Sequence, residues 1–470
     1  MSGGSSQPRP TVAVAGGGLA GLAAGCALAE AGFRVTLFER RPYLGGRASS
    51  YQHPGTGEVV DNCQHVLLGC CTNLVDFYRR IGVEEKIRWF DRLVFVEPGG
   101  RQSAISPTWL PAPLHTAPSF LLSPSLGLRN KLAIARAMLA IARGAEDDGS
   151  ENFCQWLERH GQTTRAVDRF WKVVLVSALN EELERSSVRY GAQVFRESFL
   201  KSSAAGRMGV PTVPLTELYN AAGDYIRQRG GEVQLRAAVE AFAADSEKVK
   251  LCVAGKEVAF DFAVLALPFN AIGAVLPQGE VAEPLRHAVG HLKSSPITGI
   301  HLWFDRSITD LEHAVLLDRT IQWMFHKSKL LGRKAEDGGS YLELVVSSSK
   351  TLVDNPKNEI VDLAVRELGE FFPAARNARL VKSTVIKEIH ATWSPAPGAD
   401  RYRPPAVTAW PRVFLAGDWA ATGWPATMEG AVRSGYMAAE ALARAAGMRG
   451  SRFLVPDLPA RGLMRLLAGS

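Results

Sequence analysis

The chain has 470 residues, of which 46% are hydrophobic and 21% are charged, and this composition is ordinary for a soluble globular protein with a large buried core. Its formal net charge of +7 is too small for so long a chain to indicate a nucleic-acid-binding surface, although it is compatible with weak attraction to an anionic membrane. The six cysteines form neither a disulfide framework nor a CxxC pair, so we expect a reducing, cytoplasmic setting and no metal site.

The N-terminal residues suggest no targeting segment. Residues 1–10 are polar and lack apolar periodicity, so we predict a disordered tail. Residues 12–32 are apolar, but the glycines at 16, 17, 18, 21 and 25 make this stretch a poor membrane helix. We therefore expect neither a secretion signal nor a transmembrane anchor.

The first folded unit is a βαβ arrangement with a strand at 11–15, a helix at 19–31 and a second strand at 34–39. The intervening run Gly16-Gly17-Gly18-Leu19-Ala20-Gly21 matches the GxGxxG pattern. In that pattern Gly16 permits a sharp turn, Gly18 lets a pyrophosphate approach the positive N-terminus of the helix, and Gly21 lets the helix pack on the strand. The run predicts a dinucleotide site rather than a glycine-rich turn that binds nothing.

Two further features of this unit support the same prediction. Glu39 closes the second strand, where its carboxylate can accept hydrogen bonds from a ribose, and an acid there disfavours the 2′-phosphate of NADP. Arg40 follows it, and Gly45-Gly46-Arg47 comes shortly after. A flexible loop with a planar guanidinium suits contact with a pyrophosphate, although a surface turn is the alternative.

Residues 107–143 have a different character. Prolines interleave with Trp109, Phe120 and leucines, and a basic, apolar helix is predicted at 129–143. We interpret this stretch as an insertion outside the nucleotide domain. Its mixed apolar and basic composition is typical of proteins that lie on a membrane surface, and the alternative is an insertion packed on its own domain.

The remaining elements are predicted from periodicity and from turn residues. We expect helices at 211–229 and 427–442, and strands at 232–235, 239–242, 248–253, 257–260, 261–267, 296–305, 341–347 and 413–416. The strand at 413–416 delivers Gly417 and Asp418 to its C-terminal end. The helix that begins near Thr427 and Met428 would direct its free N–H groups toward the same crevice, where they can stabilise negative charge.

These motifs identify a family. The glycine-rich turn, Gly230-Gly231-Glu232-Val233, Val264 to Pro268 and the Gly417-Asp418 block resemble the flavin amine oxidase and phytoene desaturase superfamily over most of the chain. Asp61-Asn62-Cys63-Gln64-His65-Val66-Leu67-Leu68-Gly69-Cys70, Arg403-Pro404-Pro405 and Trp419 through Gly435 resemble its squalene-associated branch, the hydroxysqualene dehydroxylases. The chain departs from that branch at Cys63 and Cys71.

The resemblance implies an FAD-dependent oxidoreductase whose substrate is a C30 isoprenoid. It implies FAD as cofactor and contact of the Val239 backbone with adenine. The implied reaction is reductive dehydroxylation of hydroxysqualene to squalene in squalene and hopanoid biosynthesis, so upstream enzymes of that pathway are expected partners. The implied fold is α/β, with a Rossmann-like FAD-binding domain of the glutathione reductase type and an α+β substrate domain with a mixed sheet and helices.

The two domains are expected to be discontinuous. We assign 11–100, 211–275 and 401–447 to the FAD-binding domain, 101–210 and 276–400 to the substrate domain, and 448–470 to a C-terminal extension. A peripheral position on the cytoplasmic face of the membrane is expected if the 107–143 insertion contacts lipid. The sequence leaves the oligomeric state and the electron donor open.

Loss of hydroxide from an allylic carbon needs an acid near the oxygen and an otherwise apolar tunnel. His65 is our candidate for that acid, with Gln64 and Asp61 as its neighbours. A buried histidine that only hydrogen-bonds to backbone or flavin is the alternative for His65, and a turn cap is the alternative for Asp61. Candidate tunnel walls are Trp303, Trp323, Phe325 and Trp393.

Three other functions stay open. Carotenoid desaturation and amine oxidation both remove hydride instead of delivering it, and amine oxidases commonly frame their substrate with two aromatic rings that the sequence does not identify. A redox-inert prenyl-lipid escort is the alternative of another class. Gly16, Glu39, Arg47 and Asp418 all remain, whereas escorts of this fold have lost parts of the flavin motif.

Overall fold

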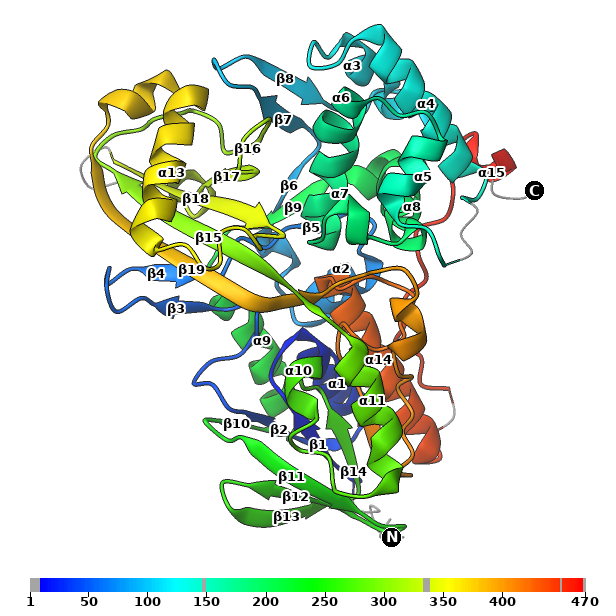
Figure 1. The fold of residues 1–470 in the computed structure, drawn as a ribbon. Helices are drawn as coiled ribbons and strands as arrows, with labels where there is room; N and C mark the ends of the chain where they lie inside the picture. Colours follow the sequence, from blue (N-terminus) through cyan, green and yellow to red (C-terminus); the bar gives the residue numbers. More distant parts are fainter. Residues whose placement is uncertain (1–8, 146–148, 333–338, 449, 468–470) are drawn as a thin grey trace, which may run out of the picture.

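The computed structural model describes residues 9–145, 149–332, 339–448 and 450–467 (Figure 1). Eight residues of the predicted 1–10 tail lie outside this range. Pro10 lies inside it, and its carbonyl accepts a hydrogen bond of 2.9 Å from the Arg34 amide. Residue 10 therefore already continues the pairing of the first two strands, and the disordered tail stays a prediction for the residues before it.

A five-stranded, all-parallel sheet forms the core of one half, which we call the parallel-sheet half. Its order is β10-β2-β1-β14-β20. Its strands are β1 (Thr11–Ala15), β2 (Arg34–Glu39), β10 (Glu232–Leu235), β14 (Phe262–Leu265) and β20 (Val413–Leu415). Since three separate stretches of chain supply these strands, the sheet is discontinuous, as predicted.

Alternate residues of these strands pack on two different layers, which is why the strands are apolar throughout. Val12 and Val14 pack against helices α1 (Leu19–Glu30), α9 (Leu215–Gln228) and α14 (Met428–Ala445). Ala13 and Ala15 face the opposite layer. That layer contains β11 (Val239–Ala244), β12 (Val249–Val253), β13 (Lys256–Phe260), α10 (Phe269–Ile272) and α11 (Glu283–His291).

A seven-stranded mixed sheet forms the second half, the mixed-sheet half, and its order is β19-β15-β18-β17-β16-β7-β8. Helix α13 (Lys357–Phe371) covers one face (Figure 1). The strands are β7 (Leu93–Val96), β8 (Gln102–Ile105), β15 (Ser294–Phe304), β16 (His313–Leu316), β17 (Trp323–His326), β18 (Ser340–Ser347) and β19 (Leu380–Trp393). Strand β7 falls in the segment 11–100 that we assigned to the FAD-binding domain, yet it pairs with β16. The domain boundaries stay a prediction.

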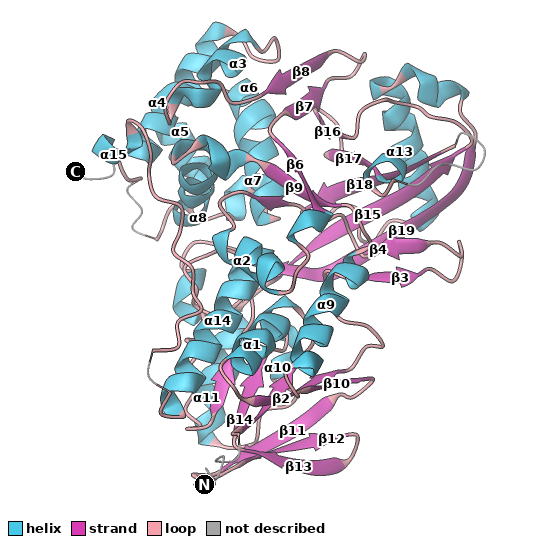
Figure 2. Cartoon of the chain, turned by 180° about the vertical axis from the view of Figure 1, so that it is seen from behind, coloured by secondary structure: helices cyan, strands magenta, loops and turns pink. Residues whose placement is uncertain are grey.

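Helices cluster beside this sheet, on the side away from α13 (Figure 2). They are α3 (Ala117–Leu122), α4 (Leu128–Ala142), α5 (Phe153–Arg159), α6 (Thr164–Ala166), α7 (Lys172–Leu179) and α8 (Val188–Phe195). A π-helical turn, Val167–Trp171, joins α6 to α7. The predicted insertion 107–143 supplies α3 and α4. None of the described helices is both long enough and apolar enough to cross a bilayer.

Smaller elements connect the halves. They are β3 (Ser50–Gln52) with β4 (Val59–Asp61), β5 (Leu67–Leu68) with β9 (Met208–Pro211) and β6 (Ile87–Phe90), and helices α2 (Thr72–Arg80), α12 (Lys327–Leu330) and α15 (Met464–Leu467). The predicted helix 211–229 begins only at Leu215, because Pro211 ends β9 and Pro214 precedes the first helical turn.

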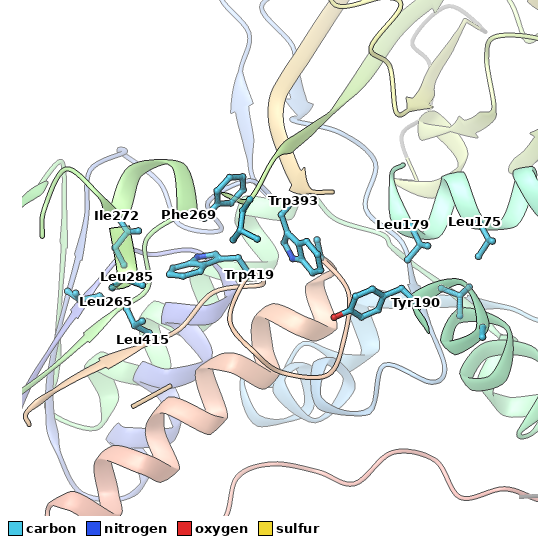
Figure 3. Close-up of a cluster of buried hydrophobic side chains, with 14 of the residues drawn as sticks. Leu175, Leu179, Tyr190, Leu265, Phe269, Ile272, Leu285, Trp393, Leu415 and Trp419 are labelled. Carbon is cyan, nitrogen blue, oxygen red and sulfur yellow. The ribbon is translucent and has the colours of Figure 1, made fainter. Parts of the chain in front are cut away.

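One hydrophobic cluster runs through the junction between the halves (Figure 3). Tyr190 of α8 and Trp393 at the end of β19 meet edge to face, with ring centroids 5.7 Å apart. The Trp393 indole N–H donates to the Asp418 carbonyl at 3.0 Å, and the Trp419 indole N–H donates to the Leu267 carbonyl at 3.0 Å. The residues just after β20 are therefore fixed against both halves.

Candidate functional site

A cavity lies where the two halves meet. Thirteen of the fourteen predicted cofactor-binding residues line it: Gly16, Gly18, Leu19, Ala20, Glu39, Arg40, Gly46, Arg47, Val239, Gly417, Asp418, Thr427 and Met428. His65 and Gln64 line it as well. Gly21 and Asp61 are the two predicted site residues that do not. The fold thus brings together motifs from both ends of the chain.

The glycine-rich turn has the geometry that its spacing predicts. Gly16 has a φ of +111°, and a Cβ there would lie 2.4 Å from the Ala266 carbonyl oxygen. A Cβ at Gly21 would lie 1.9 Å from the Gly16 oxygen, so Gly21 serves the packing of α1 and not the cavity wall. A Cβ at Gly18 would contact only the Gly46 Cα, at 3.9 Å. The turn is therefore open to a ligand at Gly18.

The N-terminus of α1 begins at this opening. No side chain caps it, and its first turn contains no acidic residue. Its free N–H groups and the helix dipole together favour an anion such as a phosphate.

Glu39 is held rigidly at the end of β2. Its carboxylate accepts hydrogen bonds from the Gly17 amide at 2.7 Å and from the Arg41 amide at 2.8 Å. Each carboxylate oxygen has a second lone pair. The buried side chain can thus still accept a hydrogen bond from a ligand hydroxyl in the cavity.

Arg47 and Asp418 form an ion pair of 2.6 Å across 371 positions of sequence. The other terminal nitrogen of Arg47 donates to the Ala391 carbonyl at 2.7 Å. We expected Arg47 to bridge phosphate oxygens, but both of its terminal nitrogens have partners within the protein. The guanidinium closes the cavity wall between β19 and the end of β20.

The Gly417-Asp418 block leads directly into the N-terminus of α14. The Gly417 amide donates to the Ser434 hydroxyl at 2.8 Å, and the Thr427 hydroxyl accepts from the Gly430 amide at 3.0 Å. The predicted helix start is therefore confirmed, with Thr427 as its N-cap. Met428 is the first helical residue and lines the cavity.

His65 is a neutral imidazole in the cavity wall. Its Nδ1 lies 2.7 Å from the Cys63 carbonyl oxygen. Because a carbonyl can only accept, Nδ1 carries the hydrogen and Nε2 is left as an acceptor. Burial lowers the pKa of His65 below its ordinary value of 6.5. This geometry disfavours the acid that we expected at His65 and suits a proton acceptor instead.

Asp61 and Gln64 both contact Lys327, which the sequence analysis missed. The Lys327 ammonium lies 2.6 Å from Asp61 Oδ2 and donates to Gln64 Oε1 at 2.9 Å. Burial alone would raise the pKa of Asp61, but the ammonium outweighs it and lowers that pKa. Asp61 is thus a buried anion behind the wall that does not line the cavity, and its catalytic role stays a prediction.

The far end of the cavity is largely apolar. Its walls there include Val66, Ala178, Ile297, Trp323, Phe325 and Val345. Trp323 and Phe325 are stacked with centroids 5.6 Å apart and planes at 8°, and the Trp323 indole N–H donates to the Ser177 hydroxyl at 2.8 Å. A group held between two rings needs roughly twice the van der Waals spacing of 3.5–4.0 Å, so this pair does not frame a substrate.

Two expected tunnel residues lie elsewhere: Trp303 stacks on Tyr341, and Trp393 belongs to the junction cluster described above. The cavity has other polar wall residues that sequence reasoning missed, namely Asn62, Ser177, Asn180, Glu388 and Thr392. Within the described part of the chain, no three histidine, cysteine or acidic side chains converge on a metal-sized site.

Comparisons with known proteins agree with this architecture. A family model described as flavin containing amine oxidoreductase matches residues 19–443. The 15-cis-phytoene desaturase of Synechococcus elongatus is 27% identical over 92% of this chain and 95% of its own length. The zeta-carotene desaturase of Synechocystis is 26% identical over 92% of this chain and 96% of its own length. These relatives are carotenoid desaturases and not hydroxysqualene dehydroxylases.

Solved structures show the same fold. An oxidoreductase from Methanosarcina mazei superposes with a TM-score of 0.71 at 18% identity and covers 90% of this chain and 98% of its own. Cyclohexylamine oxidase from Brevibacterium oxydans superposes with a TM-score of 0.70 at 16% identity and covers 94% of this chain and 100% of its own.

The residues present fit a flavin dinucleotide. The opening at Gly18, the uncapped start of α1 and the fixed Glu39 carboxylate suit its pyrophosphate and ribose, and the cavity continues past Asp418 into apolar walls. Because the family match spans residues 19–443, this chain belongs to the flavin containing amine oxidoreductase family and is an FAD-dependent oxidoreductase.

Proposed function

We propose that this protein exchanges hydride between FAD and a long acyclic isoprenoid, and that desaturation of a carotene precursor is its reaction. The observation that carries the proposal is the neutral His65 imidazole, with Nε2 as acceptor, in a cavity whose far walls are apolar. Relatives that match nearly the full length of the chain are named as phytoene and zeta-carotene desaturases.

The cofactor roles follow from the lining residues. We assign the pyrophosphate to Gly16, Gly18 and the Leu19-Ala20 start of α1, and a ribose to Glu39 with Arg40 beside it. We assign the adenine to the Val239 backbone. Gly46 and the Arg47–Asp418 pair would border the flavin, together with Gly417 and the Thr427-Met428 start of α14. When bound, FAD supplies the hydride acceptor.

Desaturation removes a hydride from one carbon and a proton from its neighbour, and a double bond forms between them. In this proposal the proton passes to His65 Nε2, which is unprotonated near neutral pH because burial lowers the pKa of the imidazole. Val66, Ile297 and Phe325 would hold the chain by apolar contact and exclude water.

The test is anaerobic mixing of oxidised, FAD-loaded protein with phytoene and with zeta-carotene. We expect the flavin to bleach while the absorption of the polyene moves to longer wavelength. Neither change with either lipid would overturn desaturation, and bleaching by a polyamine alone would favour amine oxidation. A colourless protein that cannot be reconstituted with FAD would revive the lipid escort.

Reductive dehydroxylation of hydroxysqualene is the second candidate. It is favoured by the segment that carries the resemblance to hydroxysqualene dehydroxylases, since Asn62 to Val66 line the cavity. Its acid would have to be a group other than neutral His65. Chemically reduced, FAD-loaded protein should then be reoxidised by hydroxysqualene with formation of squalene, and reoxidation without squalene would exclude it.

We also propose that the protein collects its lipid from an anionic membrane through the α3–α4 region. Trp109 is 91% exposed, Leu122 84% and Leu128 68%, and Arg129 and Arg136 are exposed nearby. Leu466 of α15 is 77% exposed, and α15 lies on this side of the molecule (Figure 1). Apolar side chains flanked by arginines suit a lipid surface with negative headgroups.

Two residues of the predicted membrane segment have other roles. Phe120 packs on Phe170 with centroids 5.5 Å apart, and the Lys131 ammonium is buried on the Leu121 and Ser123 carbonyls. The test is therefore sedimentation with phosphatidylglycerol vesicles of wild type and of Leu121→Glu/Leu122→Glu. Equal pelleting would reject this surface.

A further inference from the structure

Three ionisable side chains, those of Lys327, Asp61 and Glu343, are buried behind the part of the cavity wall that holds His65. Lys327, the first residue of α12, is 2% exposed. Its Nζ lies 2.6 Å from Asp61 Oδ2, 2.9 Å from Gln64 Oε1 and 3.4 Å from Glu343 Oε2. The ammonium thus donates two hydrogen bonds, to Asp61 and Gln64, and the Glu343 carboxyl lies within ion-pair distance of it.

Two of these contacts hold the two ends of one short segment. Asp61 ends β4, and its other oxygen accepts from the Leu215 amide at 3.2 Å, at the start of α9. Gln64 donates through Nε2 to the His65 carbonyl at 3.0 Å. Between them Asn62 and Cys63 line the cavity. Lys327 therefore links the mixed-sheet half to the segment that carries the imidazole.

We propose that Lys327 is a positioning residue, whose ammonium fixes residues 61–65 in the cavity wall and thereby places the His65 imidazole for proton transfer. This inference rests on the proposed function, because the role of His65 belongs to it. Burial of an ammonium between carboxylates is weak evidence for stability, since apolar side chains of similar volume often stabilise a fold as well or better. A role in holding residues 61–65 in place accounts for the burial of the Lys327 ammonium behind the cavity wall.

Glu343 makes the arrangement sensitive to pH. It lies in β18 and is fully buried, and neither of its oxygens has a hydrogen-bond partner among the described residues. The groups that face it are Lys327 from α12, Asp61 and Cys63 from the wall segment, and His301 from β15; its neighbour on β17 is the apolar Phe325.

Burial raises the pKa of Glu343 to about 8. Below that pH the protonated carboxyl leaves the ammonium to Asp61 and Gln64. Above it the carboxylate competes with them for Lys327.

The first test compares Lys327→Met with a matched control, Lys329→Met, in FAD-loaded protein. Lys329 lies two positions further on in α12, where its ammonium contacts Asp310 at the surface. We expect amide hydrogen exchange of peptides that cover 61–66 to speed up in Lys327→Met and to stay at the wild-type rate in the control. We also expect kcat to fall about 10- to 100-fold at equal flavin content, since small misplacements of a catalytic group cost that much.

A double variant separates positioning from charge balance. Lys327→Met/Asp61→Asn leaves no unpaired charge at this ion pair, so its melting temperature should recover toward wild type. Exchange in 61–66 should remain fast and kcat low, because nothing holds Gln64. If the double variant shows the wild-type exchange rate and the wild-type kcat, the proposal is overturned. Lys327 would then serve only to balance the charge of Asp61.

Glu343→Gln supplies a readout that a structural role would not change. Wild-type kcat should fall as pH rises through about 8, and the variant should lack this fall. If kcat of Glu343→Gln still falls as pH rises through about 8, Glu343 is not the group that makes the arrangement sensitive to pH. If no lipid is turned over by wild type, the proposed function fails, while the exchange measurement still decides whether Lys327 holds the segment.

Discussion

The two ends of the cavity are built in different ways. At the nucleotide end the wall is mostly backbone: the turn at Gly16 to Gly18, the start of α1 and the start of α14. At the other end the wall is made of side chains from α7, β17 and β18, such as Ser177, Trp323 and Val345. Backbone sites depend on short sequence patterns, whereas side-chain walls depend on which distant elements the fold brings together. Substitutions should therefore separate flavin retention from turnover.

The largest effect is expected at Gly16. Gly16→Val places a Cβ 2.4 Å from the Ala266 carbonyl oxygen in a backbone with positive φ, and overpacking alone costs about 1–3 kcal/mol. The protein should be purified without flavin, as judged by its visible absorbance. Gly290→Ala is the control, because a Cβ there meets nothing within 4 Å; it should stay yellow. A Gly16→Val protein that is still yellow would show that flavin retention does not depend on this backbone turn.

His65 should show the opposite behaviour. His65→Ala should keep its flavin and lose about 10²- to 10⁴-fold in kcat, the usual contribution of a general base. In wild type kcat should be lost as pH falls through the pKa of His65, which burial places below 6.5, because protonation removes the acceptor. His390→Ala, at an exposed position of β19, is the control. A rate that rises on acidification would favour dehydroxylation instead.

Asp418 should have an intermediate effect on the cofactor. Asp418→Asn leaves the Arg47 guanidinium, whose side chain is 29% exposed, without its counter-ion. We expect the Kd for FAD to rise about tenfold, or about 1.4 kcal/mol, as measured by flavin fluorescence titration. Asp91→Asn breaks the surface pair with Arg207 and should leave the Kd unchanged. An unchanged Kd in Asp418→Asn would show that the Arg47–Asp418 ion pair does not contribute to FAD binding.

Ser177 should show the smallest effect. Ser177→Ala leaves the Trp323 indole N–H without its acceptor, and a net hydrogen bond contributes about 0.5–1.5 kcal/mol. We expect KM for the lipid to rise about two- to tenfold, with flavin content unaltered. A loss of flavin would show that the two ends are coupled.

The signals of the nucleotide end are local in the sequence, so the residues that line this part of the cavity could be named in advance. Gly16, Gly18 and Glu39 lie within one βαβ unit, and the strand at 413–416 is an apolar run that ends at Gly417. The strands predicted at 248–253 and 257–260 are also present, and they pair as a hairpin that turns at Ala254 and Gly255. Each of these depends on neighbouring residues and on turn chemistry.

The other end was not predictable in the same way. Lys327 and Asp61 are 266 positions apart, and nothing local to either residue indicates the other. One signal was available: Glu343 interrupts the apolar run from Tyr341 to Val346, and a charge inside a buried strand requires a partner. The acid role for His65 was inferred from chemistry alone, without the Cys63 carbonyl that fixes its tautomer.

The pairing of Arg47 with Asp418 also sets an order of events during synthesis. A chain is made from its N-terminus, and domains fold as they emerge from the ribosome. Here the glycine-rich turn is made first, but the wall opposite it is supplied by residues 417–431. The wall opposite the glycine-rich turn is therefore missing until residues 417–431 have been made, so the cavity can be completed only after that part of the chain has emerged.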